Sequence, residues 1–332
     1  MSKRKRLLGA VAAAALAVGL GAAPASHAEM LGEGVVMFFQ MGGSPGGGAT
    51  LPRTNGARAA AEAFGVDLRE QYSNWQPETM LNHFREAVAG NADCIEIMGH
   101  PGNDAFIDLV QEARDQGILV TSGNAPLSKL IALHQEQGFG YAGVDLYAGG
   151  WLTGKKMVEA GKLQAGDKAV VYGLLAQGER GLSTKGVLES LEDSGLEVDY
   201  LEISPEVDAD ASLAVPIITG YLSSNPDVKA IGTQHGNVTG MFAEILEAAG
   251  KQPGEITAGG IDLVPATIDG LKDGWVSVTL DQQLYLQGFL PVTQCVLSKK
   301  YGFAGLSINT GAGVVTPETI DALVPLIESG IR

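Results

Sequence analysis

The chain alternates between strand-like and helix-like segments, and this alternation occurs in two successive blocks. In the first block, the apolar runs GVVMFFQ (34–40) and ADCIEIM (92–98) predict strands, and PETMLNHFREAVA (77–89) predicts a helix. Pro77 suits the first turn of that helix, and Gly90 suits its end. Repeated strand–helix–strand units of this kind build parallel sheets that are covered by helices.

The second block begins with a long helix predicted over 148–160. Strands are predicted at DKAVVYGL (167–174) and WVSVTL (275–280), and the tail adds a strand near 313–316 and a helix from Pro317. No long flexible linker separates the two blocks. The sequence therefore predicts an α/β fold with two similar, doubly wound parallel-sheet lobes.

The first 28 residues differ from the rest of the chain. A basic start, MSKRKR, is followed by the apolar run LLGAVAAAALAVGLGAA (7–23) and by small residues at Ser26 and Ala28. This order predicts a secretory signal peptide over residues 1–28 that is cleaved after Ala28. A membrane anchor is the alternative, but the apolar run is short for a membrane span. We therefore expect a soluble protein that is exported to the periplasm.

The charge balance argues against two kinds of partner. The 332 residues include 38 acidic and 22 basic side chains, and the formal net charge is −16. Cleavage of the signal peptide would make the chain more acidic still. Nucleic acids and anionic membrane surfaces both require a basic footprint on the protein. We expect neither as a partner.

The two cysteines of the chain both lie in apolar segments. Cys94 is within a predicted strand, and Cys295 is within the predicted helix GFLPVTQCVL (288–297). Two buried free thiols are the expected state. Because exported proteins also form disulfides, a bond between the two cysteines stays open as the alternative.

The glycine-rich stretch MGGSPGGG (41–48) directly follows the first predicted strand. Its glycine spacing does not match the dinucleotide fingerprint, and it has no lysine for a P-loop. Ligands of open parallel sheets bind beyond the carboxyl ends of the strands. This stretch and MGHPGND (98–104), which follows the third strand, are therefore predicted to line one ligand cleft. A plain glycine-rich turn is the alternative.

The sequence shows no evident nucleophile–base pair, no HExxH motif and no zinc-ligand spacing. EVDADAS (206–212) places Asp208 and Asp210 as in part of a calcium loop, but the glycine and the final acid of such a loop are missing. We expect no catalytic residue, no metal site and no cofactor, and therefore not an enzyme.

Polar or aromatic side chains stand at or just after the ends of many predicted strands. Each of them could instead be a helix cap or a residue that stabilises a loop. Together, amide, imidazole, guanidinium and carboxylate groups suit a neutral polyhydroxylated ligand, because they donate to and accept from hydroxyl groups. The residues predicted to bind the ligand are Gln40, Ser44, Trp75, His100, Asn124, Arg180, His235, Asn237, Asp262 and Gln282.

Three segments of the second block carry a resemblance to a known family. SNPDVKAIGTQHG (224–236) is similar to a proline–aspartate turn and a strand that ends in a ligand-binding polar residue. GGIDLVPATIDGLKDG (259–274) is similar to a strand–aspartate–turn–helix segment, and WVSVTLDQQLYLQG (275–288) to the last strand before the chain crosses back. Over nearly all of its mature length, the chain resembles periplasmic sugar-binding proteins of ABC transporters, of the ribose-binding type, which share their fold with the lactose-repressor core.

The resemblance implies a type I periplasmic binding fold with two lobes. Residues 29–142 plus 283–312 would form the N-terminal lobe, and residues 143–282 plus 313–332 the C-terminal lobe. Three segments would cross between the lobes, near Gly143, near Asp281-Gln282 and near 309–315.

The resemblance also implies roles for single residues. His235 stands where the family has a ligand-binding aspartate or asparagine, and Gln282 matches a glutamine at the hinge. Asp262 matches an aspartate that often caps the next helix. Asn124 lies near the family's aspartate–arginine pair, and Arg180 lies near its sugar-binding arginine.

The chain departs from the family at two points. Glycines follow Pro45 where the family often has an aromatic pair, and Pro216 stands where an amide is expected. Both departures weaken the case for ribose as the ligand. Aromatic stacking on a sugar could come instead from Phe39, Trp75 or Trp151.

The expected function is that of the substrate-binding component of a bacterial carbohydrate importer. The protein would bind a small neutral sugar or polyol between its lobes, act as a monomer and dock on the membrane permease of an ABC transporter. The alternative is a receptor that presents a sugar or a furanose signal to a chemoreceptor or sensor.

Overall fold

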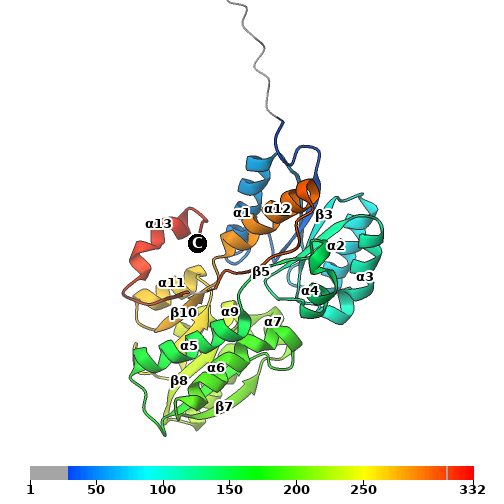
Figure 1. The fold of residues 1–332 in the computed structure, drawn as a ribbon. Helices are drawn as coiled ribbons and strands as arrows, with labels where there is room; N and C mark the ends of the chain where they lie inside the picture. The colour runs from blue at the N-terminus through cyan, green and yellow to red at the C-terminus, as the bar shows by residue number, and fades with distance from the viewer. Residues whose placement is uncertain (1–28, 312) are drawn as a thin grey trace, which may run out of the picture.

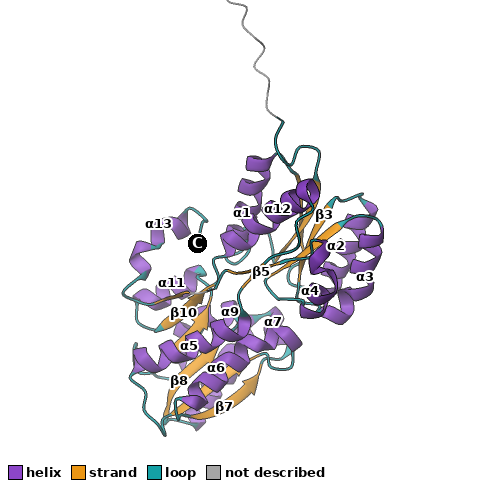
Figure 2. Ribbon diagram, viewed as in Figure 1, coloured by secondary structure: helices purple, strands orange, loops and turns teal. Residues whose placement is uncertain are grey.

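The computed structural model describes residues 29–311 and 313–332, which form two α/β lobes (Figure 1). The predicted signal peptide, residues 1–28, lies outside the described residues. Each lobe contains one six-stranded sheet with helices on both faces (Figure 2), so the predicted fold class is confirmed. Among the helices described, none is long and apolar enough to cross a membrane.

The first sheet is entirely parallel, with strands in the order β11-β5-β4-β3-β1-β2. Its central strands are buried on both faces, and all five residues of CIEIM in β3 are buried. Such continuous apolar runs are typical of parallel sheets that carry helices on both sides. The strands are β1 (Val36–Gly42), β2 (Asp67–Tyr72), β3 (Cys94–Met98), β4 (Leu119–Gly123), β5 (Tyr141–Gly143) and β11 (Ser307–Asn309).

Helices cover both faces of this first sheet. On one face, three helices pack apolar side chains that include Phe84, Phe106 and Leu130 against the strands. On the other face, two helices contribute Ala57 and Val292 to a second apolar cluster. The first three are α2 (Pro77–Ala89), α3 (Asn103–Asp115) and α4 (Ser128–His134), and the other two are α1 (Leu51–Phe64) and α12 (Leu284–Tyr301).

The second sheet repeats this plan with one antiparallel edge. Its order is β12-β10-β9-β8-β6-β7, and β12 runs antiparallel to β10. The four remaining pairings are all parallel. The strands are β6 (Lys168–Gly173), β7 (Glu197–Glu202), β8 (Val228–Thr233), β9 (Thr257–Ile261), β10 (Val278–Asp281) and β12 (Gly313–Val315).

The helices of the second lobe also lie on both faces of its sheet. Met157 and Val187 belong to the apolar cluster on one face, and Ile218, Phe242 and Leu271 belong to the cluster on the other. The helices are α5 (Leu146–Gly161), α6 (Leu182–Asp193), α7 (Pro205–Ala209), α8 (Ala214–Ser224), α9 (Gly236–Gly240), α10 (Phe242–Ala248), α11 (Pro265–Lys272) and α13 (Val324–Glu328).

The chain passes between the two sheets three times. The crossings lie between β5 and α5, between β10 and α12, and between β11 and β12, close to the three segments expected. Asn309 ties two of them together, because its side-chain oxygen accepts a hydrogen bond from the backbone N–H of Asp145. The exact residue boundaries of the lobes stay a prediction.

Several short elements differ from the sequence-based expectation. Helices α4 and α7 and strand β11 were not predicted. The final α-helix begins at Val324 rather than at Pro317, after a 3₁₀ turn at Ile320–Ala322. Short elements carry little hydrophobic periodicity, and contacts made elsewhere in the fold decide their position.

Cys94 and Cys295 form a disulfide, so the prediction of two free thiols is wrong. Cys94 lies in β3 and Cys295 in α12, and their Cα atoms are 6.2 Å apart. Both cysteines belong to the apolar cluster between α12 and the first sheet. The apolar character of the two segments indicated burial correctly, but it gave no information on the distance between them.

Candidate functional site

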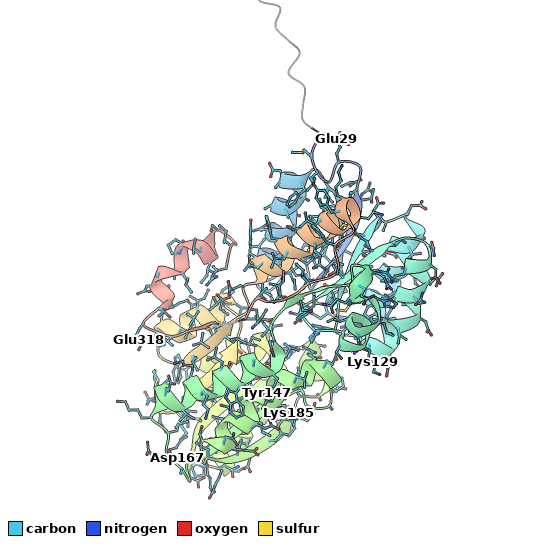
Figure 3. The ribbon with its side chains drawn as sticks, in the orientation of Figure 1. Glu29, Lys129, Tyr147, Asp167, Lys185 and Glu318 are labelled. Atoms are coloured by element: carbon cyan, nitrogen blue, oxygen red, sulfur yellow. A yellow bond between two sulfur atoms is a disulfide. The ribbon has the colours of Figure 1, made fainter. Side chains whose placement is uncertain are left out.

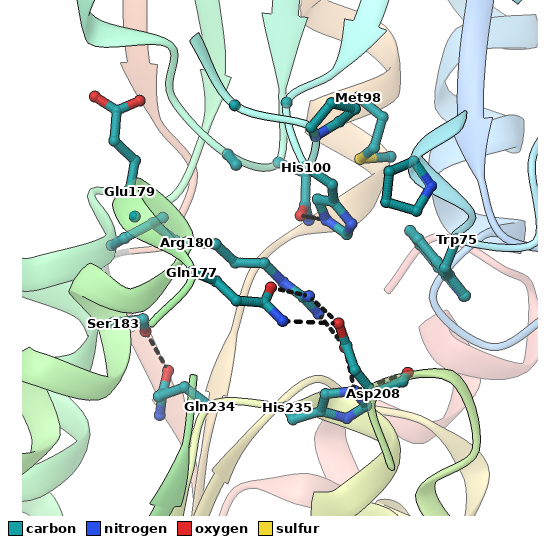
Figure 4. A pocket seen from close by; sticks show the side chains of 18 of the residues that line it. Trp75, Met98, His100, Gln177, Glu179, Arg180, Ser183, Asp208, Gln234 and His235 are labelled. Carbon is teal, nitrogen blue, oxygen red and sulfur yellow. Dashed lines mark hydrogen bonds and ion pairs between the residues drawn. The ribbon is translucent and has the colours of Figure 1, made fainter. Parts of the chain in front are cut away.

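A cavity of about 800 Å³ lies between the two lobes (Figure 4). The first lobe lines it with residues that follow β2, β3 and β4, and the second lobe with residues that follow β6, β7, β8 and β9. The segment after β10 closes it at the hinge. Because the strands of both sheets end at this cavity, the loops that follow them converge there.

The structure brings together eight of the ten residues predicted to bind a ligand. They come from both lobes and from the hinge, although they are spread over more than half of the chain. Those that line the cavity are Trp75, His100, Asn124, Arg180, His235, Asn237, Asp262 and Gln282.

Gln40 does not line the cavity, because its side chain belongs to the core of the first lobe. It is completely buried. Its amide nitrogen donates to the backbone oxygen of Met80 at 2.8 Å, and its amide oxygen accepts from the backbone N–H of Met98 at 3.1 Å. These bonds connect β1 to α2 and to the end of β3, which supports the loop that carries His100.

Ser44 also lies outside the cavity lining, on an exposed turn. The segment Gly42–Gly46 matches the GxSxG pattern in which hydrolases carry a serine nucleophile. However, Ser44 Oγ donates to Asn74 Oδ1 at 2.7 Å and not to a histidine. The geometry therefore gives Ser44 a role in joining two loops, without the base that a nucleophile requires.

Asp208 is the centre of a hydrogen-bonded cluster on the second lobe (Figure 4). Arg180 binds its carboxylate with both terminal nitrogens, at 2.7 and 2.9 Å. Gln177 Nε2 donates to the same carboxylate at 3.0 Å, and His235 Nε2 lies 3.0 Å from it. We call Gln177, Arg180, Asp208 and His235 the Asp208 cluster.

The Asp208 cluster holds its carboxylate in the ionised form. Partial burial would raise the pKa of Asp208, but the hydrogen bonds from His235, Arg180 and Gln177 outweigh burial and keep that pKa well below its usual range. The guanidinium of Arg180 is therefore paired with a negative charge. A ligand that meets this cluster finds directed hydrogen-bonding groups rather than an unpaired cation.

Trp75, His100 and Asn124 form the opposite wall of the cavity, on the first lobe. The rings of Trp75 and His100 are stacked, with centroids 5.6 Å apart and an angle of 21° between their planes. His100 Nε2 lies 2.8 Å from Asn124 Oδ1. Burial and the positive charge of Arg180 lower the pKa of His100 to about 3, so its imidazole is neutral at physiological pH.

The glycine-rich loop makes room for Trp75. A Cβ atom on Gly42 or Gly43 would collide with the indole ring of Trp75, and Gly42 has a φ of +95°, which favours glycine. Backbone N–H groups of Ser73 and Trp75 donate to the carbonyl oxygen of Gly42, at 2.9 and 3.3 Å. Ala49, the residue after this stretch, lines the cavity, but none of residues 41–48 does, so the prediction that the stretch itself lines the cleft is wrong. The loop therefore supports an aromatic wall that comes from a different loop.

Two polar residues that the sequence analysis missed lie beneath the first-lobe wall. Arg53 of α1 lines the cavity, is 1% exposed and forms an ion pair with the fully buried Glu96 of β3. The guanidinium also lies over the ring of Phe39, 5.2 Å from its centroid. The signal was present in the sequence, because a glutamate in the middle of the apolar strand CIEIM requires a buried partner.

Asp262 and Gln282 form the hinge side of the cavity. Gln282 Nε2 donates to Asp262 Oδ1 at 2.7 Å. Burial raises the pKa of Asp262 to about 6, and the nearby Asp281 acts in the same direction, although the Gln282 bond and His235 oppose the shift. Asp262 has a φ of 74°, which is uncommon for a residue other than glycine and is often found at binding sites.

Further cavity residues were not among the ten predicted to bind the ligand. Gln234 follows β8 and its amide oxygen accepts from Ser183 Oγ at 2.6 Å. Asp208 lies in α7 and had been considered only as part of an incomplete calcium loop. In residues 29–311 and 313–332, no group of three or more histidine, cysteine or acidic side chains is placed to hold a metal ion.

Comparisons with known proteins agree with this architecture. The sequence profile of the family described as "Periplasmic binding protein domain" matches residues 52–298. The xylose/arabinose-binding protein XylF of Sulfolobus acidocaldarius is 29% identical over 254 residues, which cover 73% of this chain. The match spans 61% of the length of that relative.

Solved structures with the same fold include two with bound ligands. A carbohydrate transporter from Acidothermus cellulolyticus, in complex with myo-inositol, has a TM-score of 0.73 and 21% identity, and the match covers 90% of this chain and 99% of that one. An ABC-transporter solute-binding protein from Burkholderia graminis, in complex with D-arabinose, has a TM-score of 0.74 and 22% identity, covering 86% and 96%. With its two-lobed fold, interlobe cavity and matching profile, the chain belongs to the periplasmic binding protein domain family.

Proposed function

We propose that this protein is the substrate-binding component of an ABC importer and that it binds a small neutral sugar or polyol between its lobes. Its relatives support the proposal, because their names include a xylose/arabinose-binding protein and solute-binding proteins in complex with D-arabinose and D-allose. These names favour transport, so the signalling alternative is not proposed.

The observation that carries this proposal is the composition of the cavity wall. Both lobes and the hinge contribute amide, imidazole and carboxylate groups, and the two arginines are each paired with an acidic side chain. An anionic ligand would have to compete with Glu96 or Asp208 for these arginines. A neutral ligand with several hydroxyl groups can use the remaining donors and acceptors without breaking either ion pair.

The way the ligand is held follows from the two-lobed fold. A ligand that contacts both walls stabilises the closed arrangement over an open one, because it gains contacts from the second wall only when the lobes approach. We infer that the closed form docks on a membrane permease, that the protein is exported to the periplasm and works as a monomer, and that it binds its ligand without chemical change.

A thermal-shift screen tests the proposal directly. The panel contains D-xylose, L-arabinose, D-arabinose, D-allose and myo-inositol, with galacturonate and glucose 6-phosphate as charged controls. A ligand at a hundred times its dissociation constant stabilises the folded state by about 2.7 kcal/mol, which is a shift of at least several degrees for a chain of this length. Stabilisation by the charged controls alone, or by no member of the panel, would count against a neutral sugar or polyol as the ligand.

A further inference from the structure

Glu179 connects the two lobes across the mouth of the cavity. It lies in the 3₁₀ turn Gly178–Gly181, between β6 and α6 of the second lobe. Its carboxylate accepts hydrogen bonds from the backbone N–H of Ser128 at 3.2 Å, from Ser128 Oγ, and from Asn103 Nδ2 at 2.9 Å. Ser128 and Asn103 begin α4 and α3 of the first lobe, so every one of these bonds joins one lobe to the other.

The first-lobe side of this contact is held in place by hydrogen bonds that do not involve Glu179. Asn103 Oδ1 accepts from the backbone N–H groups of Lys129 and Leu130, at 3.0 and 3.3 Å. These bonds fix the orientation of the amide, because its oxygen is used by α4 and its nitrogen must face Glu179. The side chain of Ser128 lies beside it, and together they present three donors to a carboxylate.

The second-lobe side is fixed by the Asp208 cluster. Gln177 and Arg180 flank Glu179 in the chain, and both donate to Asp208. Figure 4 shows that the Glu179 carboxylate points away from this cluster. Glu179 also lines the cavity, but its carboxylate is bonded to the first lobe. A ligand that orders Arg180 also orders the turn that carries Glu179.

No other side-chain hydrogen bond spans the mouth in the part of the chain that the structure describes. The other bonds between lobes lie at the crossings, as for Asp145 and Asn309, or at the C-terminal tail, where Asn55 donates to Gly330. We propose that Glu179 is a closure latch that stabilises the closed arrangement of the lobes through Ser128 and Asn103. Its consequence for ligand affinity rests on the proposed function, because closure completes the site.

Spin labels on the two lobes measure this closure in ligand-free protein. Cysteines introduced as Glu112→Cys in α3 and Lys185→Cys in α6 report the interlobe distance by double electron–electron resonance; Lys185 is labelled in Figure 3. The native cysteines are bonded to each other and do not react with the label. The latch is weakened by Glu179→Gln, which removes the negative charge and leaves one acceptor oxygen where the carboxylate has two. Glu192→Gln, an exposed carboxylate of the same lobe with no bond to the first lobe, is the matched control.

Because hydrogen bonds to a charged group are stronger than those to a neutral one, we expect Glu179→Gln to raise the ratio of open to closed protein by about tenfold. Glu192→Gln should leave the distance distribution unchanged. Ser128→Ala should also open the lobes, and adding it to Glu179→Gln should have little further effect, because both changes remove one interaction. Unchanged distances in Glu179→Gln, or fully additive effects of the two substitutions, would overturn the latch. Since no ligand is used, the absence of any stabilising sugar in the thermal-shift screen would not affect this result. Unchanged distances in Glu179→Gln would likewise leave the proposed sugar binding untouched.

Discussion

Removal of the Cys94–Cys295 disulfide should lower the free energy of unfolding substantially. The bond closes a loop between residues 201 positions apart. In the chain-entropy treatment of disulfides, a loop of this length corresponds to about 5 kcal/mol at 25 °C, and losses of about 2–5 kcal/mol are typical when a native disulfide is removed. Both cysteines are almost fully buried in one apolar cluster, so the double substitution to alanine adds no buried polar group.

Equilibrium unfolding in urea separates the bond from the packing of its sulfur atoms. Wild type, Cys295→Ala and Cys94→Ala/Cys295→Ala are compared with and without dithiothreitol. Under oxidising conditions, both variants should unfold at lower urea than wild type. With dithiothreitol, wild type should lose the contribution of the bond, so its midpoint should fall most of the way to those of the variants. It should stay slightly above them, because its thiols still fill the space that alanine leaves.

Two results would refute this reasoning. The first is the detection of two reactive thiols in wild-type protein that has been denatured without a reducing agent. The second is a wild-type midpoint that does not depend on dithiothreitol while the variants are much less stable. The second result would mean that packing around Cys94 and Cys295, rather than the bond, supplies the stability.

Two further predictions concern the cavity. Gly42→Ala should cost about 1–3 kcal/mol of stability, because alanine is strained at a φ of +95° and its Cβ would collide with Trp75. Urea unfolding and indole fluorescence measure this cost. Gly46→Ala is the control, because Gly46 is also at positive φ but has open space around it. Asp262 has a folded-state pKa raised to about 6. Its contribution to stability is therefore fully present below the unfolded-state pKa near 4 and is lost as pH rises through 6. Wild type should lose about 2 kcal/mol more than Asp262→Asn between pH 4 and 7, and parallel pH profiles of the two proteins would contradict the raised pKa.

The order of strands and helices could be predicted because it depends on local patterns. Alternating apolar runs and helix-type periodicity are properties of neighbouring residues, and helix α2 begins at Pro77 and ends at Ala89 as predicted. Helix α4 could not be found in this way. Its first turn is stabilised by Asn103, a residue 25 positions earlier in the chain, and this contact exists only after folding.

The same distinction explains the residues of the candidate site. His100 and Asn124 could be predicted to lie close together, because parallel strands place their carboxyl ends at one edge of a sheet. Asp262 belongs to the other sheet, and its place in the same cleft was predicted from the two-lobed fold. Gln40 also stands in the first strand, but its side chain faces the core, and the sequence of a strand buried on both faces does not tell the two sides apart. Asp208 was missed as a ligand-site candidate because its partners, Arg180 and His235, are 28 and 27 positions away.

The glycine-rich stretch shows how a departure from the family pattern can be compensated elsewhere. In this chain, glycines follow Pro45 where an aromatic pair was expected. The missing aromatic surface is supplied by Trp75, whose ring lies directly against Gly42 and Gly43 and stacks on His100 at the cavity wall. Large side chains at the two glycines and the indole of Trp75 cannot occupy the same space. Gly42 and Gly43, which precede Pro45, are therefore the condition for an aromatic wall built from the loop after β2, and a bulky substitution at either position should remove that wall rather than extend it.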